Sequence, residues 1–219
     1  MRRLALALVL IAGACGASTP ADTDNATPLA AVAATTTTTS TTTTTIAATP
    51  RETASEVSIV GDALPVFGAT PDPAIGMPAP VVAGAGFDGS EVTIGPSDKF
   101  RVVMFLAHWC SHCRGEVEEL GPHLKLSPPP ANVELFSVST SARPAGDNYP
   151  PSEWLTPGAW PVPVLVDTED TAIANAFGLT AFPYWVVVDP DGVVLGRTAG
   201  SLPVESVEAL FDNLAEREG

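Results

Sequence analysis

A chain of 219 residues can hold one or two domains, and this one carries 25 acidic against 10 basic residues, a formal net charge of −15. An excess of acidic residues this large excludes roles that depend on binding nucleic acid or anionic lipid head groups. The first third of the chain has too little apolar character to fold, so we expect one folded domain with a core of ordinary size.

The amino terminus has the pattern of an export signal. Arg2 and Arg3 are followed by the apolar stretch 4–12, which is too short to span a bilayer, and small residues then lead to Cys15. The pattern resembles bacterial lipoprotein signals, in which the cysteine is lipidated. Ala12 stands where that family usually has leucine, and 12–14 also fits ordinary signal-peptidase cleavage, so secretion without a lipid and an uncleaved anchor are alternatives. All three alternatives place the folded domain outside the cytoplasm, where disulfides persist.

Residues 15–72 are predicted to be a lipidated amino terminus and a disordered linker, after a signal peptide at 1–14. Ten threonines surround Ser40 in the stretch 35–45, and nothing there offsets the entropy of ordering the chain. A flexible tether or a glycosylated stalk would have this composition. Some apolar residues at 56–67 leave open a contact with the domain, which we expect to occupy 73–219.

The alternation of apolar and polar residues, together with turn residues, predicts the strands and helices of this domain. An Asp88-Gly89 turn predicts an amino-terminal β-hairpin, and the apolar run 101–107 predicts a strand buried on both faces. Gly121-Pro122 is expected to end or kink the helix predicted at 110–120. Strands are expected at 81–82, 91–94, 101–107, 133–139, 163–167, 184–188 and 193–197, and helices at 110–120, 152–155, 171–177 and 203–216. This order predicts an α/β fold with a central mixed β-sheet flanked by helices.

The other two cysteines, Cys110 and Cys113, lie between the buried strand and the first helix. A strand that leads into a helix through Cys-x-x-Cys is typical of a thioredoxin-like redox site. At a helix amino terminus, free N–H groups and the helix dipole favour a thiolate at Cys110. Cys113, three residues later on the same side, can reach that sulfur. A static disulfide closing so small a loop would add little stability.

Trp109-Cys110-x-x-Cys113, Phe182-Pro183 before a strand, and the Asp191-Gly192 turn together resemble the thioredoxin superfamily. The early hairpin and the insertion before Val164 resemble its TlpA/ResA-like branch of membrane-tethered thiol–disulfide oxidoreductases. The resemblance implies that Cys110 attacks and Cys113 resolves, as a redox-active disulfide. It also implies that Pro183 is the family's cis-proline, and that Trp109 and Phe182 contact the partner. We expect no cofactor, a monomer, and partners that are protein thiols or disulfides and a membrane or extracytoplasmic redox protein.

Two positions depart from thioredoxin. His112 replaces the proline that reductants of the family usually have before the second cysteine, and a histidine there favours the reduced form, which makes the disulfide more oxidising. Met104 stands where thioredoxin has a buried acid, so a proton acceptor must come from elsewhere; Glu116 and His108 are candidates. Membrane anchoring favours a reductant and His112 an oxidant, which leaves the direction of electron flow open.

Metal carriage and peroxide reduction are alternatives to disulfide exchange. The cluster His108, Cys110, His112 and Cys113 has donor types suited to Cu(I) or Zn(II), but copper-delivery relatives of this fold space their cysteines one residue further apart. Peroxiredoxins place a proline and a threonine ahead of the reactive cysteine, at positions held here by Val103 and Ala107. Thiol–disulfide exchange with proteins is therefore the predicted function, with metal carriage as the alternative.

Overall fold

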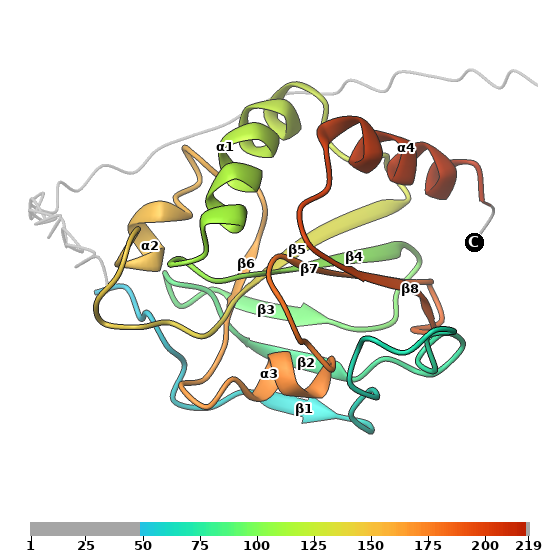
Figure 1. The fold of residues 1–219 in the computed structure, drawn as a ribbon, viewed down its shortest axis with the longest axis horizontal. Coiled ribbons are helices and arrows are strands. Elements are labelled where there is room, and N and C mark those ends of the chain that lie inside the picture. The colour runs from blue at the N-terminus through green and yellow to red at the C-terminus, as the bar shows by residue number, and fades with distance from the viewer. Residues whose placement is uncertain (1–48, 218–219) are drawn as a thin grey trace, which may run out of the picture. The chain divides into compact units, whose positions relative to one another are not determined.

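The computed structural model describes residues 49–217 (Figure 1). The predicted signal at 1–14, Cys15 and the threonine tract lie outside these residues. Within the described part of the chain, no helix is both long and apolar enough to cross a bilayer.

A five-stranded mixed sheet forms the centre of the fold, as predicted. Its strand order is β6-β5-β4-β7-β8; β4, β5 and β6 are parallel, and β7 and β8 are antiparallel to their neighbours. The strands are β4 Phe100–Leu106, β5 Val133–Ser139, β6 Val164–Val166, β7 Tyr184–Val188 and β8 Val194–Ala199. Every residue of β4 is buried, which explains its unbroken apolar sequence.

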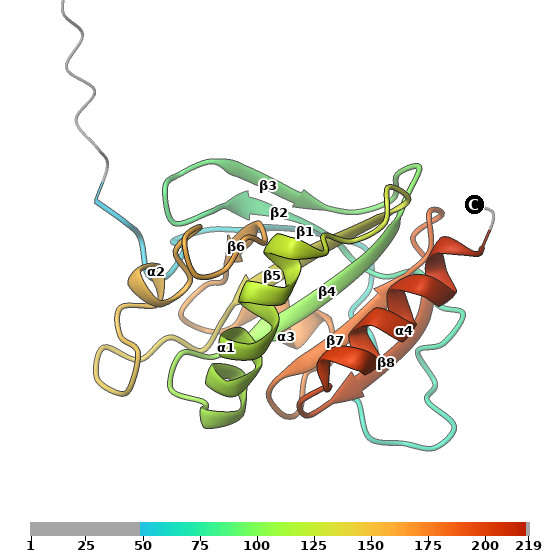
Figure 2. The same cartoon turned by 90° about the horizontal axis from the view of Figure 1, so that it is seen from above.

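The alternating side chains of β4 separate two core clusters. Val102, Met104 and Leu106 pack with helices α1 Ser111–Leu126 and α4 Val204–Ala215, which lie side by side on one face of the sheet (Figures 1 and 2). Val103 and Phe105 point to the opposite face. That face is covered by a second, antiparallel sheet and by α3 Ala172–Ala176. The second sheet consists of β1 Ser58–Val60, β2 Val81–Ala85 and β3 Glu91–Ile94, and the remaining helix is α2 Pro151–Trp154.

The folded part begins before residue 73, the boundary expected from the sequence. Strand β1 pairs with β2, Leu64 is buried, and Glu52 accepts hydrogen bonds from the backbone and hydroxyl of Ser152. Asp72 pairs with Arg197 of β8, whose side chain is fully buried. Residues 49–72 therefore belong to the domain, and the expected linker does not extend to 72.

Helix α1 also differs from the expectation, because it continues through Gly121-Pro122 to Leu126. Leu120 and Leu124 are both buried in the core between the helix and the central sheet, so packing on either side of the proline holds the helical path. A Cβ at Gly121 would overlap the carbonyl oxygen of Ala159, so glycine is the residue that fits there. The prediction of a helix end at 121–122 is wrong because tertiary packing outweighs the local signal. The other predicted elements differ from the structure by no more than three residues at either end.

Candidate active site

The cysteine pair lies where the central strand β4 leads into helix α1. The Cys110 N–H donates to the Ala107 carbonyl at 3.0 Å, which turns the chain between the strand and the helix. Cys110 has an extended backbone and is the N-cap of α1, and its Sγ accepts a hydrogen bond from the Cys113 N–H at 3.4 Å. A sulfur atom therefore occupies the place that a serine or aspartate oxygen takes in an ordinary helix cap.

The two thiols are free and differ in exposure. Cys110 is 9% exposed, whereas Cys113 is 0% exposed. Burial, and to a smaller degree the interactions with Cys110 and Glu116, raises the pKa of the Cys113 thiol well above its usual range. Cys110 is therefore the residue of the pair that lies nearer the surface, and burial favours the protonated form of Cys113.

Trp109 and Phe182 are brought together although they lie far apart in the sequence. Their rings meet edge to face with centroids 5.6 Å apart, and the Trp109 indole N–H donates to the Ser141 carbonyl at 2.8 Å. The peptide bond between Phe182 and the buried Pro183 is cis. The residue before the first cysteine thus contacts the segment that leads into β7.

His112 is exposed, and its carbonyl oxygen lies 3.5 Å from the Ser201 hydroxyl. Within residues 49–217 its imidazole ring makes no hydrogen bond to another side chain or to the backbone. The influence of His112 on the redox pair therefore stays a prediction.

His108 has a structural place that its sequence context did not reveal. It is 1% exposed; its Nδ1–H donates to the Asp147 carbonyl at 2.7 Å, and its Nε2 accepts the Arg143 N–H at 3.0 Å. A backbone N–H can only donate, so Nε2 carries no proton and the ring is neutral. Because both ring nitrogens are occupied by backbone partners, His108 holds a loop and is not free to bind a metal or accept a proton.

That loop, residues 141–149, lies in the insertion before Val164. Its Arg143 guanidinium lies over the Trp109 ring, 3.9 Å from the ring centroid. Its Asp147 carboxylate is 3.7 Å from the Arg114 guanidinium on α1. We call residues 141–149 the clamp loop, since it contacts the redox segment from one side.

Glu116 is a buried acid beside the cysteines. It is 3% exposed, and its carboxylate accepts the Leu202 N–H at 3.0 and 3.2 Å. Burial raises the pKa of Glu116, which the Leu202 hydrogen bond only partly offsets. Met104, which replaces the buried acid of thioredoxin, lies in the core on the same face of the sheet as α1.

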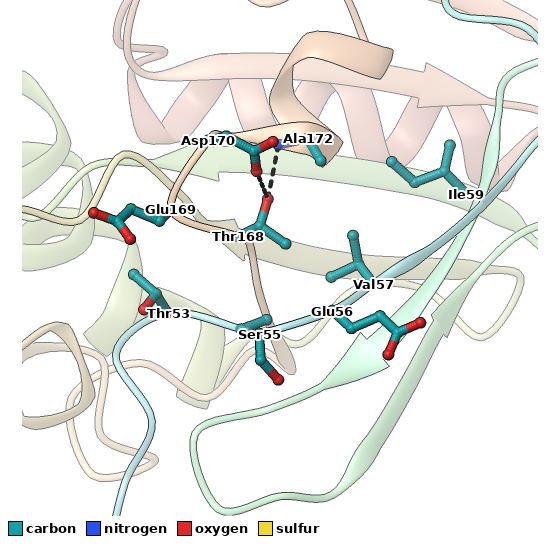
Figure 3. A pocket seen from close by; sticks show the side chains of 10 residues that line it. Thr53, Ser55, Glu56, Val57, Ile59, Thr168, Glu169, Asp170 and Ala172 are labelled. Atoms are coloured by element: carbon teal, nitrogen blue, oxygen red, sulfur yellow. Dashed lines mark hydrogen bonds between the residues drawn. The ribbon is translucent and has the colours of Figure 1, made fainter.

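A groove of about 1010 Å³ lies elsewhere, between the amino-terminal segment and the turn before α3 (Figure 3). There the Thr168 hydroxyl donates to Asp170 and accepts the Ala172 N–H. The residues that line it, 53–57, 59, 168–170 and 172, include neither cysteine. Among residues 49–217, no three His, Cys, Asp or Glu side chains are grouped so that they could hold a metal ion.

The AhpC/TSA family model matches residues 73–196, which is more than half of the chain. The chain belongs to the AhpC/TSA family. Several solved structures of other proteins share its fold. StoA from Bacillus subtilis is 15% identical, with a TM-score of 0.51 over 61% of this chain and 97% of StoA. The thioredoxin domain of a thiol-disulfide oxidoreductase from Bacteroides vulgatus is 20% identical, with a TM-score of 0.51 over 65% of this chain and 99% of that one.

A thiol:disulfide interchange protein of the thioredoxin family from Chlorobium tepidum is 20% identical, with a TM-score of 0.52 over 71% of this chain and 99% of that one. No curated protein sequence matches the chain. At these identities the solved structures establish the fold, and the predicted thioredoxin-like fold is confirmed. Family and fold together make the chain a thioredoxin-like oxidoreductase.

Proposed function

We propose that the chain is an extracytoplasmic thiol–disulfide oxidoreductase that exchanges disulfides with protein partners through Cys110 and Cys113. The observation that carries this proposal is the asymmetry of the pair. Cys110 is 9% exposed and its sulfur accepts an N–H bond at a helix amino terminus, whereas Cys113, three residues later, is 0% exposed. Attack by an accessible sulfur and release by a protected one require this difference.

The exchange balances without a cofactor. The Cys110 thiolate attacks one sulfur of a partner disulfide, forms a mixed disulfide and displaces the partner's other sulfur as a thiolate, which takes up a proton. Cys113 then loses its proton and attacks the Cys110 sulfur. This step closes the Cys110–Cys113 disulfide and releases the second partner thiol. Two electrons pass from the pair to the partner, and the reverse sequence oxidises a partner dithiol.

Glu116 is the proposed acceptor of the Cys113 proton. Its buried carboxylate interacts electrostatically with that thiol, and its raised pKa suits a group that takes up and returns a proton. Among the two candidates from the sequence, Glu116 is favoured over His108, because both ring nitrogens of His108 are already bonded.

Phe182, Pro183 and Trp109 are proposed to receive the partner's extended segment beside Cys110. The contact between the Trp109 and Phe182 rings supports this role, because it joins the redox turn to the start of β7. The partners are then proteins that present a cysteine in an extended stretch, and the chain works on them as a monomer.

The amino-terminal pattern supports a location outside the cytoplasm. We propose a signal peptide at 1–14, lipidation of Cys15 at the outer face of the cell membrane, and a tether between Cys15 and the domain. If Cys15 is not lipidated, the same domain is secreted. Mass spectrometry of the chain recovered from membranes distinguishes the two, because lipidation adds the mass of acyl chains to Cys15.

The function is tested by exchange with a disulfide-bonded peptide, followed by mass spectrometry after thiols are blocked. Cys110→Ser is expected to abolish exchange, and Cys113→Ser to accumulate the mixed disulfide on Cys110. Ser111→Ala, an exposed change between the cysteines, is the matched control and is expected to react like the wild type. Exchange by Cys110→Ser at the wild-type rate would refute the proposal.

His112 is proposed to make the disulfide more oxidising than that of thioredoxin. The measurement is the reduction potential of the Cys110–Cys113 couple, expected above about −270 mV, the value for thioredoxin. His112→Pro is expected to lower it. A wild-type potential at or below the thioredoxin value would remove this role of His112.

A further inference from the structure

The clamp loop is fixed to the two residues that precede Cys110. Three hydrogen bonds join it to His108: the two ring bonds described above, and one from the Asn148 amide to the His108 carbonyl at 3.0 Å. A fourth joins the Trp109 indole to Ser141. The backbone of Arg143, which donates the bond to His108, is thereby placed against the redox turn.

The Arg143 side chain combines an exposed position with a guanidinium that stacks on an aromatic ring of the redox segment. Arg101, Arg114 and Arg197 each lie within ion-pair distance of a carboxylate. Among the described residues, the exposed Arg143 has no carboxylate partner and no side-chain hydrogen bond, and its guanidinium stacks on Trp109. Stacking orders the guanidinium plane while its N–H groups at the edge stay available.

The contact with Trp109 places the Arg143 guanidinium near the redox pair. The same indole that carries Arg143 also contacts Phe182 and is adjacent in sequence to Cys110. A partner segment that docks at Phe182 with its cysteine at Cys110 would lie next to the indole on which the guanidinium stacks. A planar fork of N–H donors matches the two oxygens of a carboxylate.

We propose that Arg143 is a specificity-determining residue that binds an acidic side chain next to the reactive cysteine of the partner protein. This inference rests on the proposed thiol–disulfide exchange and adds the chemistry of the partner. The rest of the chain has a large excess of negative charge, so Arg143 supplies the local attraction that an acidic segment needs at this site.

The test uses the full-length chain with its cysteine pair oxidised, and two peptides that differ only beside their single cysteine. One peptide has glutamate on both sides of the cysteine and the other has glutamine. At low ionic strength, we expect the glutamate peptide to reduce the wild-type disulfide about two to five times faster, the gain expected of an exposed ion pair. High salt should remove the difference, because it screens such pairs.

Arg143→Gln is expected to lose this preference, so that the ratio of the rates with the two peptides falls to about one. The matched control is Arg217→Gln, which removes the same charge from an exposed position after α4 and should keep the preference. Equal rates for both peptides with the wild type, or a preference that survives Arg143→Gln, would overturn the assignment of Arg143. Failure of the wild type to react with either peptide would instead overturn the proposed function, and this inference with it.

Discussion

Replacing His108 with alanine is expected to loosen the clamp loop and to destabilise the whole domain. The substitution removes the ring bond to the Asp147 carbonyl and the bond from the Arg143 N–H. It also empties the volume of a ring that is 1% exposed. Both backbone partners belong to exposed residues, so water can replace the ring and neither group is left buried without a bond.

The two lost hydrogen bonds contribute about 0.5–1.5 kcal/mol each. Part of the free energy of burying the ring is lost as well, so the total decrease in the free energy of unfolding is about 2–4 kcal/mol. This is a large share of the roughly 5–15 kcal/mol that stabilises an ordinary domain.

Urea unfolding measures the change in global stability, and amide hydrogen exchange at Arg143 reports on the loop itself. We expect the Arg143 amide to lose its protection in His108→Ala under conditions where the amides of β4 keep theirs. His112→Ala is the matched control; the exposed ring makes no hydrogen bond within residues 49–217, so the change should stay within about 0.5 kcal/mol. If His108→Ala unfolds within that range of the wild type and keeps Arg143 protected, the role given to His108 is wrong.

Three further substitutions test the packing and the charges. Asp72→Ala leaves the buried Arg197 guanidinium unpaired, and thermal or urea unfolding should show a loss of about 3–5 kcal/mol; a loss below about 1 kcal/mol would contradict the ion-pair role. The hydrogen bond from Arg197 holds the pKa of Asp72 below its ordinary 3.8, so the stability from this pair is present above pH 3.8 and is lost as the pH falls through the folded-state value. Gly121→Ala must displace the Ala159 backbone, which should cost about 1–3 kcal/mol in urea unfolding, and unchanged stability would refute the close approach. Burial raises the pKa of Glu116 above its ordinary 4.5, so protonation of Glu116 stabilises the fold fully below pH 4.5, and this contribution is lost as the pH rises through the folded-state pKa. Glu116→Gln should remove this pH dependence and be no less stable than the wild type at neutral pH. Thermal unfolding curves whose pH dependence is unchanged in Glu116→Gln would contradict this account.

The sequence predicted the elements whose signals are local. Strands β5 and β7 have the predicted bounds, because their apolar runs end at turn or proline residues. The redox turn was located by the spacing of Cys110 and Cys113 after a buried strand. Helix α1 was predicted too short, since a rule about Pro122 describes an isolated helix and takes no account of the packing on both sides of it.

Features that depend on distant partners were not predictable. The partners of His108 lie 35 to 40 residues away, so nothing in the residues around it indicated a buried, neutral ring. Strand β1 is short and its burial pattern is mostly exposed, and it is ordered by pairing with β2. Because residues 58–60 show no alternation of apolar and polar side chains, the sequence did not indicate that residues 49–72 belong to the domain.

The complete burial of Cys113 also bears on how the site withstands oxidative damage. Peroxides reach a thiol from solvent, so Cys110 is the sulfur that would first become a sulfenic acid. The Cys113 thiol, which is 0% exposed, can condense with that sulfenic acid and expel water, and the resulting disulfide can be reduced again. The irreversible sulfinic and sulfonic acids require a second oxidant to arrive before this happens, and Cys113 itself is shielded from them. Cys113 thus protects Cys110 from irreversible oxidation.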